Sequence, residues 1–341
     1  MKKSLFGIAL LMAAGVLLSV ACSKEKDDKD PKNQKVAVLL PDAAIIARWG
    51  IDKANLEKAM AAYGFNTTFY LAPETPEGAA LQVEQLKKAI NEGVKYIVVT
   101  SIDYKTINES GLLEQHPDVK VVCHDRIIID NPYIAYISSA DTREVGRTQA
   151  MFLLNHFHAT GKSSMTLEIL QGPDTDINAK EYYVGAMELL QKYIDEKKLI
   201  VKSGKTEYKD VKGDSWSVED QKKAMKSRLT SYGAGECPDM VLAATDNAAQ
   251  GAIAALEEAG ITNMPVITGQ DNAALSQTYI QNGKQTMTID KNLKDMAYNT
   301  ALIINSLIAD SPVQTGQSIP VGTITIPALY SRITLMTIDS Y

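Results

Sequence analysis

Residues 35–40 read KVAVLL and decide the fold class of this 341-residue chain. A short run in which nearly every residue is apolar is typical of a strand covered on both faces of its sheet. Residues 48–63 follow with Leu56, Ala59 and Met60 at helical spacing, and Gly64 then ends the pattern. A buried strand followed by an amphipathic helix predicts the start of a parallel α/β sheet.

The alternation of strand and helix extends through the chain, with a restart after Asp141. Further strands are predicted at residues 67–71, 96–99, 119–122, 133–137, 165–170, 199–202, 240–244, 265–268 and 285–289. Helices are predicted at residues 79–90, 141–158, 178–194, 217–232, 246–259, 273–281 and 293–309. Ten strands in two runs of five predict an α/β fold of two similar lobes, each a parallel sheet flanked by helices.

The composition excludes several classes of protein. Lys and Arg number 35 and Asp and Glu 41, a net charge of −6 with no basic block, so nucleic acid is not an expected partner. Three cysteines are too few for a disulfide-framed scaffold. We expect Cys123 to be a small buried hydrophobe in a strand. Cys237 lies in a loop of the other lobe, so the two are not expected to pair.

The first residues predict the cellular location of the protein. Lys2 and Lys3 precede an apolar run over residues 5–21, which is typical of a secretory signal peptide covering residues 1–21. Cys22 follows directly and resembles the lipidated cysteine of bacterial lipoproteins, although Ser19 stands where an aliphatic residue is usual. The resemblance implies cleavage before Cys22 and a lipid on its thiol. The alternative is a plain signal peptide with an incidental cysteine.

Residues 22–34 are nearly all charged or polar, which predicts a flexible acidic tether. Their start, CSKEKDD, resembles the acidic tag of surface-displayed lipoproteins of Bacteroides-like bacteria, and the alternative is a generic charged linker. We therefore expect a lipid-anchored protein in the cell envelope of a Gram-negative bacterium, in the periplasm or at the outer-membrane surface. Which membrane holds the lipid is left open.

Polar and aromatic side chains follow the carboxyl ends of the predicted strands, where open α/β sheets bind their ligands. These candidates are Asp42, Arg48, Trp49, Asp103, Asp125, Arg126, Asp174, Asp176, Asn178, Asp246, Asn247 and Asp271, with Trp216 in a loop before a helix. Carboxylates, amides and guanidinium groups hydrogen-bond to hydroxyls, and indole rings cover apolar C–H faces. This mixture suits a sugar, whereas a catalytic site would need a placed base, nucleophile or metal.

Each candidate has a plainer structural alternative. Asn178 and Asp246 begin predicted helices and could serve only as helix caps. Trp49 could be a core residue of its helix, Trp216 a loop anchor and Arg48 a solvated charge. The set therefore carries more weight than any of its members.

The same positions, taken in order, resemble the periplasmic sugar-binding proteins of ATP-driven importers, type I class, and within them the D-xylose-binding proteins. The resemblance covers roughly residues 35–340. The matching segments are Ala47-Arg48-Trp49, Asp125-Arg126, Tyr136-Ile137-Ser138, residues 176–180 (DINAK), the Trp216 loop, Asp246 with residues 251–253 (GAI), residues 269–271 (GQD), residues 285–288 (QTMT) with Lys291, and Ser331-Arg332. Each segment alone is a weak signal, but the ordered series is specific.

The resemblance implies roles for individual residues. Hydrogen bonds to the sugar would come from Arg48, Asp125, Arg126, Asp176, Asn178, Asp271 and Lys291, and the stacking pair would be Trp49 and Trp216. The family's Asn-Asp pair after the eighth strand is Thr245-Asp246 here. Thr245 offers one hydroxyl in place of an amide, so one sugar hydroxyl can be recognised differently. The sugar, its ring form and its anomer are left open.

The type I resemblance also implies two lobes joined by three crossings, near residues 138–139, near Asp290 and near residues 319–325. The N-terminal lobe would hold residues 35–139 and 290–318, and the C-terminal lobe residues 140–289 and 319–341. A monosaccharide would close this hinge, and an ABC permease would recognise the closed form. The alternative partner is a membrane sensor or an outer-membrane uptake system. We expect a monomer that needs no cofactor.

Other chemistries find little support in the sequence. The segment from Asp174 to Asn178 resembles the start of a calcium loop, but Ala179 and Gly185 stand where Gly and Glu are required. His156 and His158 do not share a helix face, so no metal site is expected. Neighbours along a strand point to opposite faces, which argues against a Cys–His catalytic pair at residues 123–124. A third hypothesis is an enzyme on a similar fold, but the sequence contains no catalytic motif that supports it. We therefore expect a protein that is not an enzyme.

Overall fold

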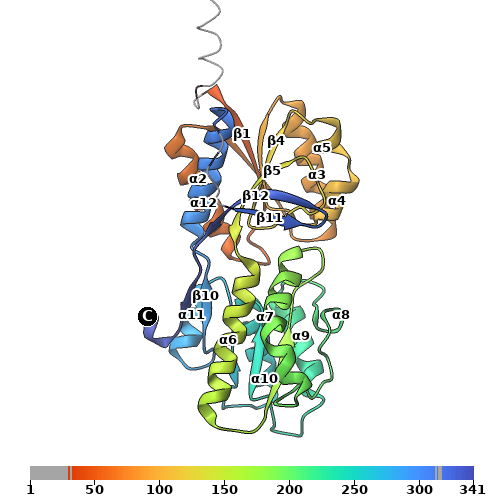
Figure 1. Cartoon of the computed structure of the whole chain (residues 1–341), viewed down its shortest axis with the longest axis vertical. Helices are drawn as coiled ribbons and strands as arrows, with labels where there is room; N and C mark the ends of the chain where they lie inside the picture. The colour runs from red at the N-terminus through yellow and green to blue at the C-terminus, as the bar shows by residue number, and fades with distance from the viewer. Residues whose placement is uncertain (1–29, 31–32, 312, 314–316) are drawn as a thin grey trace, which may run out of the picture.

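The computed structural model describes residues 30, 33–311, 313 and 317–341. The predicted signal peptide (1–21), Cys22 and most of the predicted tether (22–34) lie outside these residues. The described chain forms two lobes stacked along the long axis of the molecule in Figure 1, each built on a parallel sheet with helices on both faces. The predicted α/β fold class is therefore confirmed.

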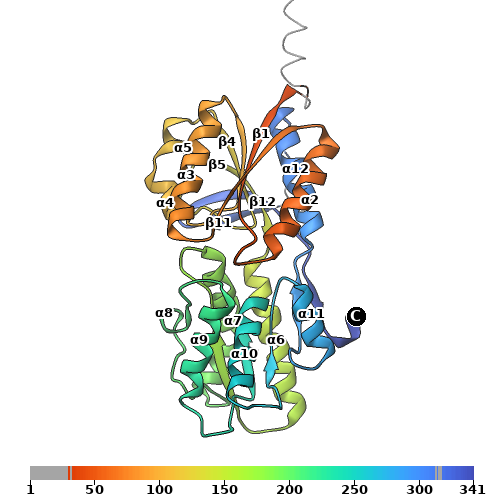
Figure 2. The same cartoon turned by 180° about the vertical axis from the view of Figure 1, so that it is seen from behind.

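The first lobe is built on a seven-stranded sheet. In sheet order its strands are β11 (Gln317–Val321), β12 (Ile324–Ser331), β5 (Ile134–Ala140), β4 (Lys120–His124), β3 (Tyr96–Val99), β1 (Lys35–Pro41) and β2 (Asn66–Ala72). All neighbours pair in parallel except β11 and β12, which form an antiparallel hairpin. One face is covered by α2 (Arg48–Tyr63) and α12 (Leu293–Ile308), the other by α3 (Pro76–Asn91), α4 (Tyr104–Glu109) and α5 (Leu112–Gln115), as Figure 2 shows.

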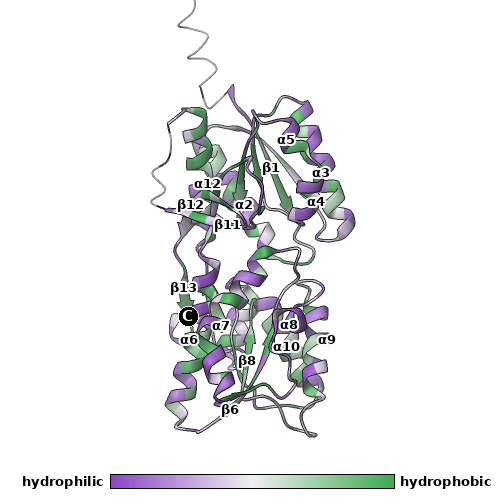
Figure 3. Cartoon of the chain, turned by 45° about the vertical axis from the view of Figure 1, so that its right-hand side comes forward, coloured by the Kyte–Doolittle hydropathy of each residue, from purple (hydrophilic) through white to green (hydrophobic). Residues whose placement is uncertain are grey.

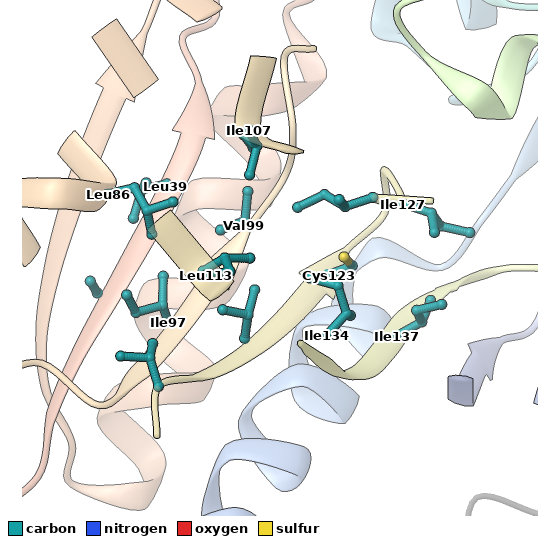
Figure 4. Packing of buried hydrophobic residues seen from close by; sticks show 14 of the residues in the cluster. Leu39, Leu86, Ile97, Val99, Ile107, Leu113, Cys123, Ile127, Ile134 and Ile137 are labelled. Atoms are coloured by element: carbon teal, nitrogen blue, oxygen red, sulfur yellow. The ribbon is translucent and has the colours of Figure 1, made fainter. Parts of the chain in front are cut away.

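After the exposed Lys35, strand β1 is apolar because both of its faces are buried. Val36, Val38 and Leu40 pack into the cluster beneath α2 and α12, and Ala37 and Leu39 into the cluster beneath α3. Figure 4 shows the second cluster, in which Leu39 lies among side chains of β3, β4 and β5. Full burial of a Val or Leu side chain stabilises a fold by about 1.5–3 kcal/mol, so β1 anchors both layers of the lobe.

The second lobe has a four-stranded parallel sheet. Its strands, in sheet order, are β7 (Leu199–Ile200), β6 (Met165–Leu170), β8 (Met240–Ala243) and β9 (Val266–Ile267). One face packs against α6 (Thr142–Thr160) and α7 (Ile177–Asp195), the other against α9 (Val218–Leu229) and α10 (Asp246–Glu258). The shorter helices α8 (Tyr208–Val211) and α11 (Ala274–Gln281) lie in the connections. In Figure 3 the central strands β1, β6 and β8 are mainly hydrophobic, whereas the helices carry hydrophilic residues as well.

Helices α6 and α7 approach each other closely because each carries a glycine at the crossing. A Cβ on Gly146 of α6 would come within 2.0 Å of the carbonyl oxygen of Tyr182, and one on Gly185 of α7 within 2.1 Å of that of Arg143. Real Cβ atoms do not approach a carbonyl so closely, so neither position accepts a side chain without a shift of the backbone. The crossing fixes α7 against α6.

Two predictions about strands are wrong. The sequence predicts a fifth strand for the second sheet at residues 285–289, but β10 (Thr288–Asp290) pairs with β13 (Thr334–Met336) in a separate antiparallel ribbon. Residues 319–325 are predicted to cross into the second lobe, but they belong to β11 and β12 of the first. The reason is that the end of β12 continues the parallel ladder beside β5. The third crossing therefore follows Ser331, and the chain ends in a short 3-10 helix, η2 (Ile338–Ser340).

The three crossings are hydrogen-bonded to one another. The first joins β5 to α6, the second joins β10 to α12, and the third joins β12 to β13. Ser331 Oγ donates to the carbonyl oxygen of Lys291 at 2.6 Å and lies 3.4 Å from that of Ser139. One hydroxyl thus links a residue from each of the three connections.

Candidate ligand-binding site

A cavity lies between the two lobes. It is lined by Ile46, Arg48, Trp49, Asp125, Arg126, Asp176, Tyr182, Trp216, Thr245, Gln270, Asp271 and Lys291. Among the residues that the family resemblance places at the ligand, Asn178 and Asp246 are the two described ones that do not belong to the lining.

The lining residues follow the carboxyl ends of strands in both sheets, as predicted. Arg48 begins α2 after β1, and Asp125 and Arg126 follow β4 directly. Asp271 follows β9, and Lys291 follows β10. Because these strand ends face the space between the lobes, residues as distant in sequence as Arg48 and Asp271 meet there as an ion pair.

Two site residues are helix caps, but they are not Asn178 and Asp246, for which capping is the alternative interpretation. Asp176 accepts a hydrogen bond from the backbone N–H of Asn178 at the start of α7. Thr245 accepts one from the backbone N–H of Ala248 at the start of α10. The caps are thus Asp176 and Thr245, which also line the cavity, and the capping interpretation of Asn178 and Asp246 is wrong.

Arg48 and Lys291 form the charged centre of the cavity. Arg48 lies 2.8 Å from Asp52, 3.1 Å from Asp125 and 3.0 Å from Asp271. Lys291 Nζ lies 2.9 Å from Asp125 and 3.5 Å from Asp271. These five side chains are at most 9% exposed, so the two cations and three carboxylates compensate one another away from water. Since Asp125 belongs to the first lobe and Asp271 to the second, the cluster joins the lobes.

These charges keep one another ionised. Burial alone would raise the pKa of Asp125, but Arg48 and Lys291 hold it well below its usual range. Burial alone would lower the pKa of Lys291, and the charge of Arg48 lowers it further, yet Asp125, Tyr182 and Asp271 bring it above its usual range. Burial lowers the pKa of Arg48 too, and its carboxylate neighbours outweigh that effect. The cavity therefore presents fixed donors and acceptors at neutral pH.

A second chain of contacts joins the two tryptophans. Trp49 donates its indole N–H to Glu74 at 3.2 Å, and Arg126 donates to the other oxygen of Glu74 at 2.5 Å. Arg126 Nε lies 3.0 Å from Asp176, which also accepts the indole N–H of Trp216 at 3.0 Å. Both indole N–H groups are therefore satisfied by the protein itself, and the rings are held in place.

The indole rings are buried walls of the cavity. The guanidinium carbons of Arg48 and Arg126 lie 4.4 and 5.0 Å from the centre of the Trp49 ring, within cation–π range. Trp216 packs on Gly172, where a Cβ would come within 2.1 Å of the indole. Both rings also belong to an apolar cluster that spans the two lobes. The interpretations of Trp49 as a core residue and of Trp216 as a loop anchor are thus compatible with a place in the lining.

Two buried amide oxygens at or beside the cavity have no hydrogen-bond partner. Asn178 donates its side-chain N–H to the carbonyl oxygen of Asp125 at 3.1 Å, which leaves its Oδ1 unpartnered. Gln270 donates to Asp271 at 3.1 Å, which leaves its Oε1 unpartnered. An unsatisfied buried acceptor costs about 1–3 kcal/mol, so a ligand that donates hydrogen bonds here gains stability.

Three candidates from the sequence lie away from the cavity. Asp42 accepts a hydrogen bond from the backbone N–H of Ala44. Asp103 is the N-cap of α4. Asp174 pairs with Lys212 at the surface. Each has a local structural role that accounts for it.

Asp246 supports the site from behind the lining. Its carboxylate accepts hydrogen bonds from the backbone N–H of Ala273 at 2.7 Å, from Gln285 at 2.9 Å and from Thr288 at 2.7 Å. It therefore ties the loop after β9, which carries Asp271, to the segment that includes β10. Asn247, next in the chain, donates hydrogen bonds to backbone carbonyls of both lobes.

Sequence reasoning misses four residues of this region, namely Ile46, Glu74, Tyr182 and Gln270. Tyr182 lies one turn after Asn178 on α7, so helical spacing could have found it. Gln270 directly precedes Asp271 in a segment already singled out. Ile46 and Glu74 lie in connections before α2 and α3, where no pattern marks them.

Neighbouring residues of β4 point to opposite faces, as predicted. Cys123 packs in the cluster beneath α3, where burial raises the pKa of its thiol to about 12. His124 lies on the other side, with Nδ1 2.8 Å from the hydroxyl of Thr300 in α12. Within the described residues Cys123 and Cys237 are free, and no group of three or more His, Cys, Asp or Glu is placed to hold a metal ion. In the same part of the chain no helix is long and apolar enough to cross a membrane.

A family model for the periplasmic binding protein domain matches residues 36–311. The chain belongs to this family. The multiple sugar-binding periplasmic receptor ChvE of Rhizobium radiobacter is 29% identical over 312 residues, which cover 90% of this chain and 85% of the relative. The D-xylose-binding periplasmic protein of Escherichia coli (strain K12) is 29% identical over 276 residues, 79% of this chain and 76% of the relative.

Solved structures of the family share the fold. An ABC transporter solute-binding protein from Clostridium phytofermentans, with bound β-D-glucose, matches with a TM-score of 0.84 and 26% identity, over 90% of this chain and 95% of that one. The match covers both lobes, so the resemblance to type I periplasmic binding proteins is confirmed. The cavity of this family member therefore lies in the cleft between its lobes.

Proposed function

We propose that the cleft binds a monosaccharide. The observation that carries this proposal is the pair of unpartnered buried amide oxygens on Asn178 and Gln270, next to fixed carboxylates and cations at the cavity between the lobes. Each hydroxyl of a sugar can donate to such an oxygen and accept from such a cation. The names of two relatives, a multiple sugar-binding receptor and a D-xylose-binding protein, support the same ligand class.

The proposal gives the lining residues complementary roles. Arg48, Arg126, Lys291 and the Thr245 hydroxyl donate to sugar oxygens. Carboxylate and amide oxygens accept from sugar hydroxyls, and these belong to the lining residues Asp125, Asp176, Gln270 and Asp271 and to Asn178 beside the lining. The indole rings of Trp49 and Trp216 cover the apolar C–H faces of the sugar ring. Asp246 is assigned no contact with the sugar. It acts by holding the loop that carries Asp271.

Within the monosaccharides we propose a xylose-like aldopentose or a related aldohexose. The support is the D-xylose-binding relative and the β-D-glucose in the structure of the Clostridium protein. Both sugars form six-membered rings of nearly the same size. No chemical step is assigned to the site, because the role proposed here is binding.

The bound sugar is proposed to stabilise the closed lobes, and an ABC-type importer is proposed to recognise that form. A lipid on Cys22, after removal of residues 1–21, is proposed to hold the protein at the membrane. The alternative is a surface or periplasmic receptor that feeds a sensor or an outer-membrane uptake system. A permease and an ATPase encoded beside this chain favour the importer, and a sensor kinase or outer-membrane porter favours the alternative.

The test is a thermal-shift screen of the full chain against aldopentoses and aldohexoses. A ligand that binds only the folded state adds about 2.7 kcal/mol of stability at a hundredfold excess over its dissociation constant. We expect a clear shift with D-xylose or a close relative. Trp49→Ala and Asp271→Ala should abolish it, whereas Asp118→Ala, at an exposed site in the first lobe, should leave it intact.

A screen in which no monosaccharide raises the melting temperature would overturn the proposal. A shift that survives both site variants would place the sugar elsewhere on the molecule. An oligosaccharide or a signal molecule would then become the ligand to test.

A further inference from the structure

Glu74 lies outside the cavity lining, yet it holds two residues that form the lining. It is in the connection between β2 and α3, directly before the helix cap Thr75. One carboxylate oxygen accepts the indole N–H of Trp49, and the other accepts a guanidinium N–H of Arg126. The side chain is 9% exposed, so its carboxylate interacts mainly with these two partners and little with water.

Arg126 is held from both lobes. Its Nη2 reaches Glu74 of the first lobe, and its Nε reaches Asp176 of the second. Asp176 in turn accepts the indole N–H of Trp216. Five buried side chains thus form one continuous chain of contacts, from the tryptophan of one lobe to that of the other.

The first half of this chain does not depend on the second lobe. Trp49, Glu74 and Arg126 all belong to the first lobe, so their contacts persist when the cleft opens and the contact with Asp176 is lost. Without Glu74, Arg126 would lose its ion-pair partner on its own lobe, and the Trp49 N–H would lose its acceptor. Both side chains would then have to be ordered at the moment of binding, at a cost in affinity.

We propose that Glu74 is a positioning residue that fixes Trp49 and Arg126 in their ligand-ready arrangement before the lobes close. Asp176 and Trp216 then dock onto a surface that is already formed. The spacing between the two indole walls is set by the Glu74–Arg126–Asp176 bridge and not by the ligand. This inference rests on the proposed binding of a sugar between the two tryptophans.

The test compares Glu74→Gln with Glu84→Gln, an exposed glutamate on α3, in the purified full chain. The affinities for D-xylose and D-glucose are measured by calorimetry. The chain has two tryptophans, so a ¹⁵N-tryptophan sample contains two indole N–H groups, whose NMR signals are assigned with Trp216→Phe. The NMR readout needs no ligand and reports directly on the hydrogen bond to Glu74.

In Glu74→Gln we expect the Trp49 indole signal to move upfield and the dissociation constant to rise about tenfold, while Glu84→Gln matches the wild type. Glu74→Asp keeps the charge with a shorter reach, so it should weaken binding less than Glu74→Gln. It also serves as the test variant if Glu74→Gln does not fold. In that case an indole signal and an affinity unchanged from wild type in Glu74→Asp overturn the proposal.

An unmoved Trp49 signal in folded Glu74→Gln, or a dissociation constant within twofold of the control, overturns the positioning role. If the wild-type chain binds neither sugar, the proposed ligand fails, and the Trp49 signal alone then decides the role of Glu74. The two failures are therefore distinguishable.

Discussion

At the scale of single residues, the buried carboxyl groups of the site are of two kinds. Asp125 lies beside two cations and stays ionised. Among the described residues no cation pairs with Asp246, and burial, with the charge of Asp271 added, raises its pKa to about 7 despite three hydrogen-bond donors. The group that ties the Asp271 loop in place therefore changes its charge near neutral pH.

Asp246 predicts a pH dependence of stability. Its pKa is raised from 3.8 in the unfolded chain to about 7 in the folded one, so the folded state holds a proton that the unfolded state releases. The stability it contributes is complete below about pH 4 and is lost as the pH rises to 7. In urea unfolding, the wild type should lose roughly 2–3 kcal/mol more than Asp246→Asn between pH 5 and pH 8.

Asp118→Asn, at an exposed position, is the matched control and should keep the wild-type pH profile. If Asp246→Asn also follows that profile, Asp246 is ionised throughout the range. The interpretation of Asp246 as a neutral-pH group would then be wrong.

Which residues reach the cleft could be predicted, because parallel strands bring their carboxyl ends to one edge of a sheet. For that reason the sequence predicts Asp125 and Asp271 at the ligand site, and both residues line the cavity in the structure. What each side chain contacts could not be predicted. Glu74 precedes α3 with no pattern to mark it, and only the packing of that connection against α2 and β4 brings it to Trp49 and Arg126.

At the scale of elements, the α6–α7 crossing determines where one wall of the cavity stands. Helix α7 begins at the cap Asp176 and carries Tyr182, and both residues line the cavity. Gly146 of α6 packs directly against the backbone of Tyr182. The position of these lining residues therefore depends on a glycine that does not itself line the cavity.

Gly146→Ala should separate the two helices. The new Cβ would stand within 2.0 Å of a backbone oxygen that cannot rotate away, and overpacking of this kind costs about 1–3 kcal/mol. We expect a lower free energy of unfolding in urea and, because α7 moves, a weaker affinity for the sugar that the wild type binds. Both quantities can be measured on the same preparation.

Gly50→Ala on α2 is the matched control, since the nearest atom to its Cβ would be 3.8 Å away. Alanine in a helix is favoured over glycine by roughly 0.5–1 kcal/mol, so this variant should be slightly more stable than the wild type. Equal stability of Gly146→Ala and Gly50→Ala would refute the close crossing.

Most elements could be predicted from the sequence because their patterns are long and their ends are marked. Helix α2 has the predicted bounds, with Gly64 in the left-handed conformation at its C-cap. The exceptions are short strands whose partners are remote. The ladder between β5 and β12 joins residues near 140 and near 330, and β10 pairs with the end of the chain. No local pattern carries that information, so these strands were assigned to the wrong sheet or lobe.

At the scale of the whole molecule, the described arrangement is closed. Arg126–Asp176 and Arg48–Asp271 are ion pairs across the cleft, and Asn178 donates to the backbone of Asp125 in the other lobe. These contacts use the groups that the proposed function assigns to the sugar. We therefore expect closure and binding to be coupled, because a ligand that adds contacts in the closed form shifts the open–closed equilibrium toward it.

Asn247 allows closure to be tested, because its side chain hydrogen-bonds to both lobes but does not line the cavity. Its amide donates to the carbonyl oxygens of Ile45 in the first lobe at 3.1 Å and Trp216 in the second at 3.0 Å. Loss of one such bond costs about 1 kcal/mol, so Asn247→Ala should bind the wild-type sugar about fivefold more weakly.

In small-angle X-ray scattering the sugar should lower the radius of gyration of both proteins, at a higher concentration for the variant. Asn91→Ala, at an exposed helix end, should titrate like the wild type, and a radius that the sugar leaves unchanged would rule out hinge closure.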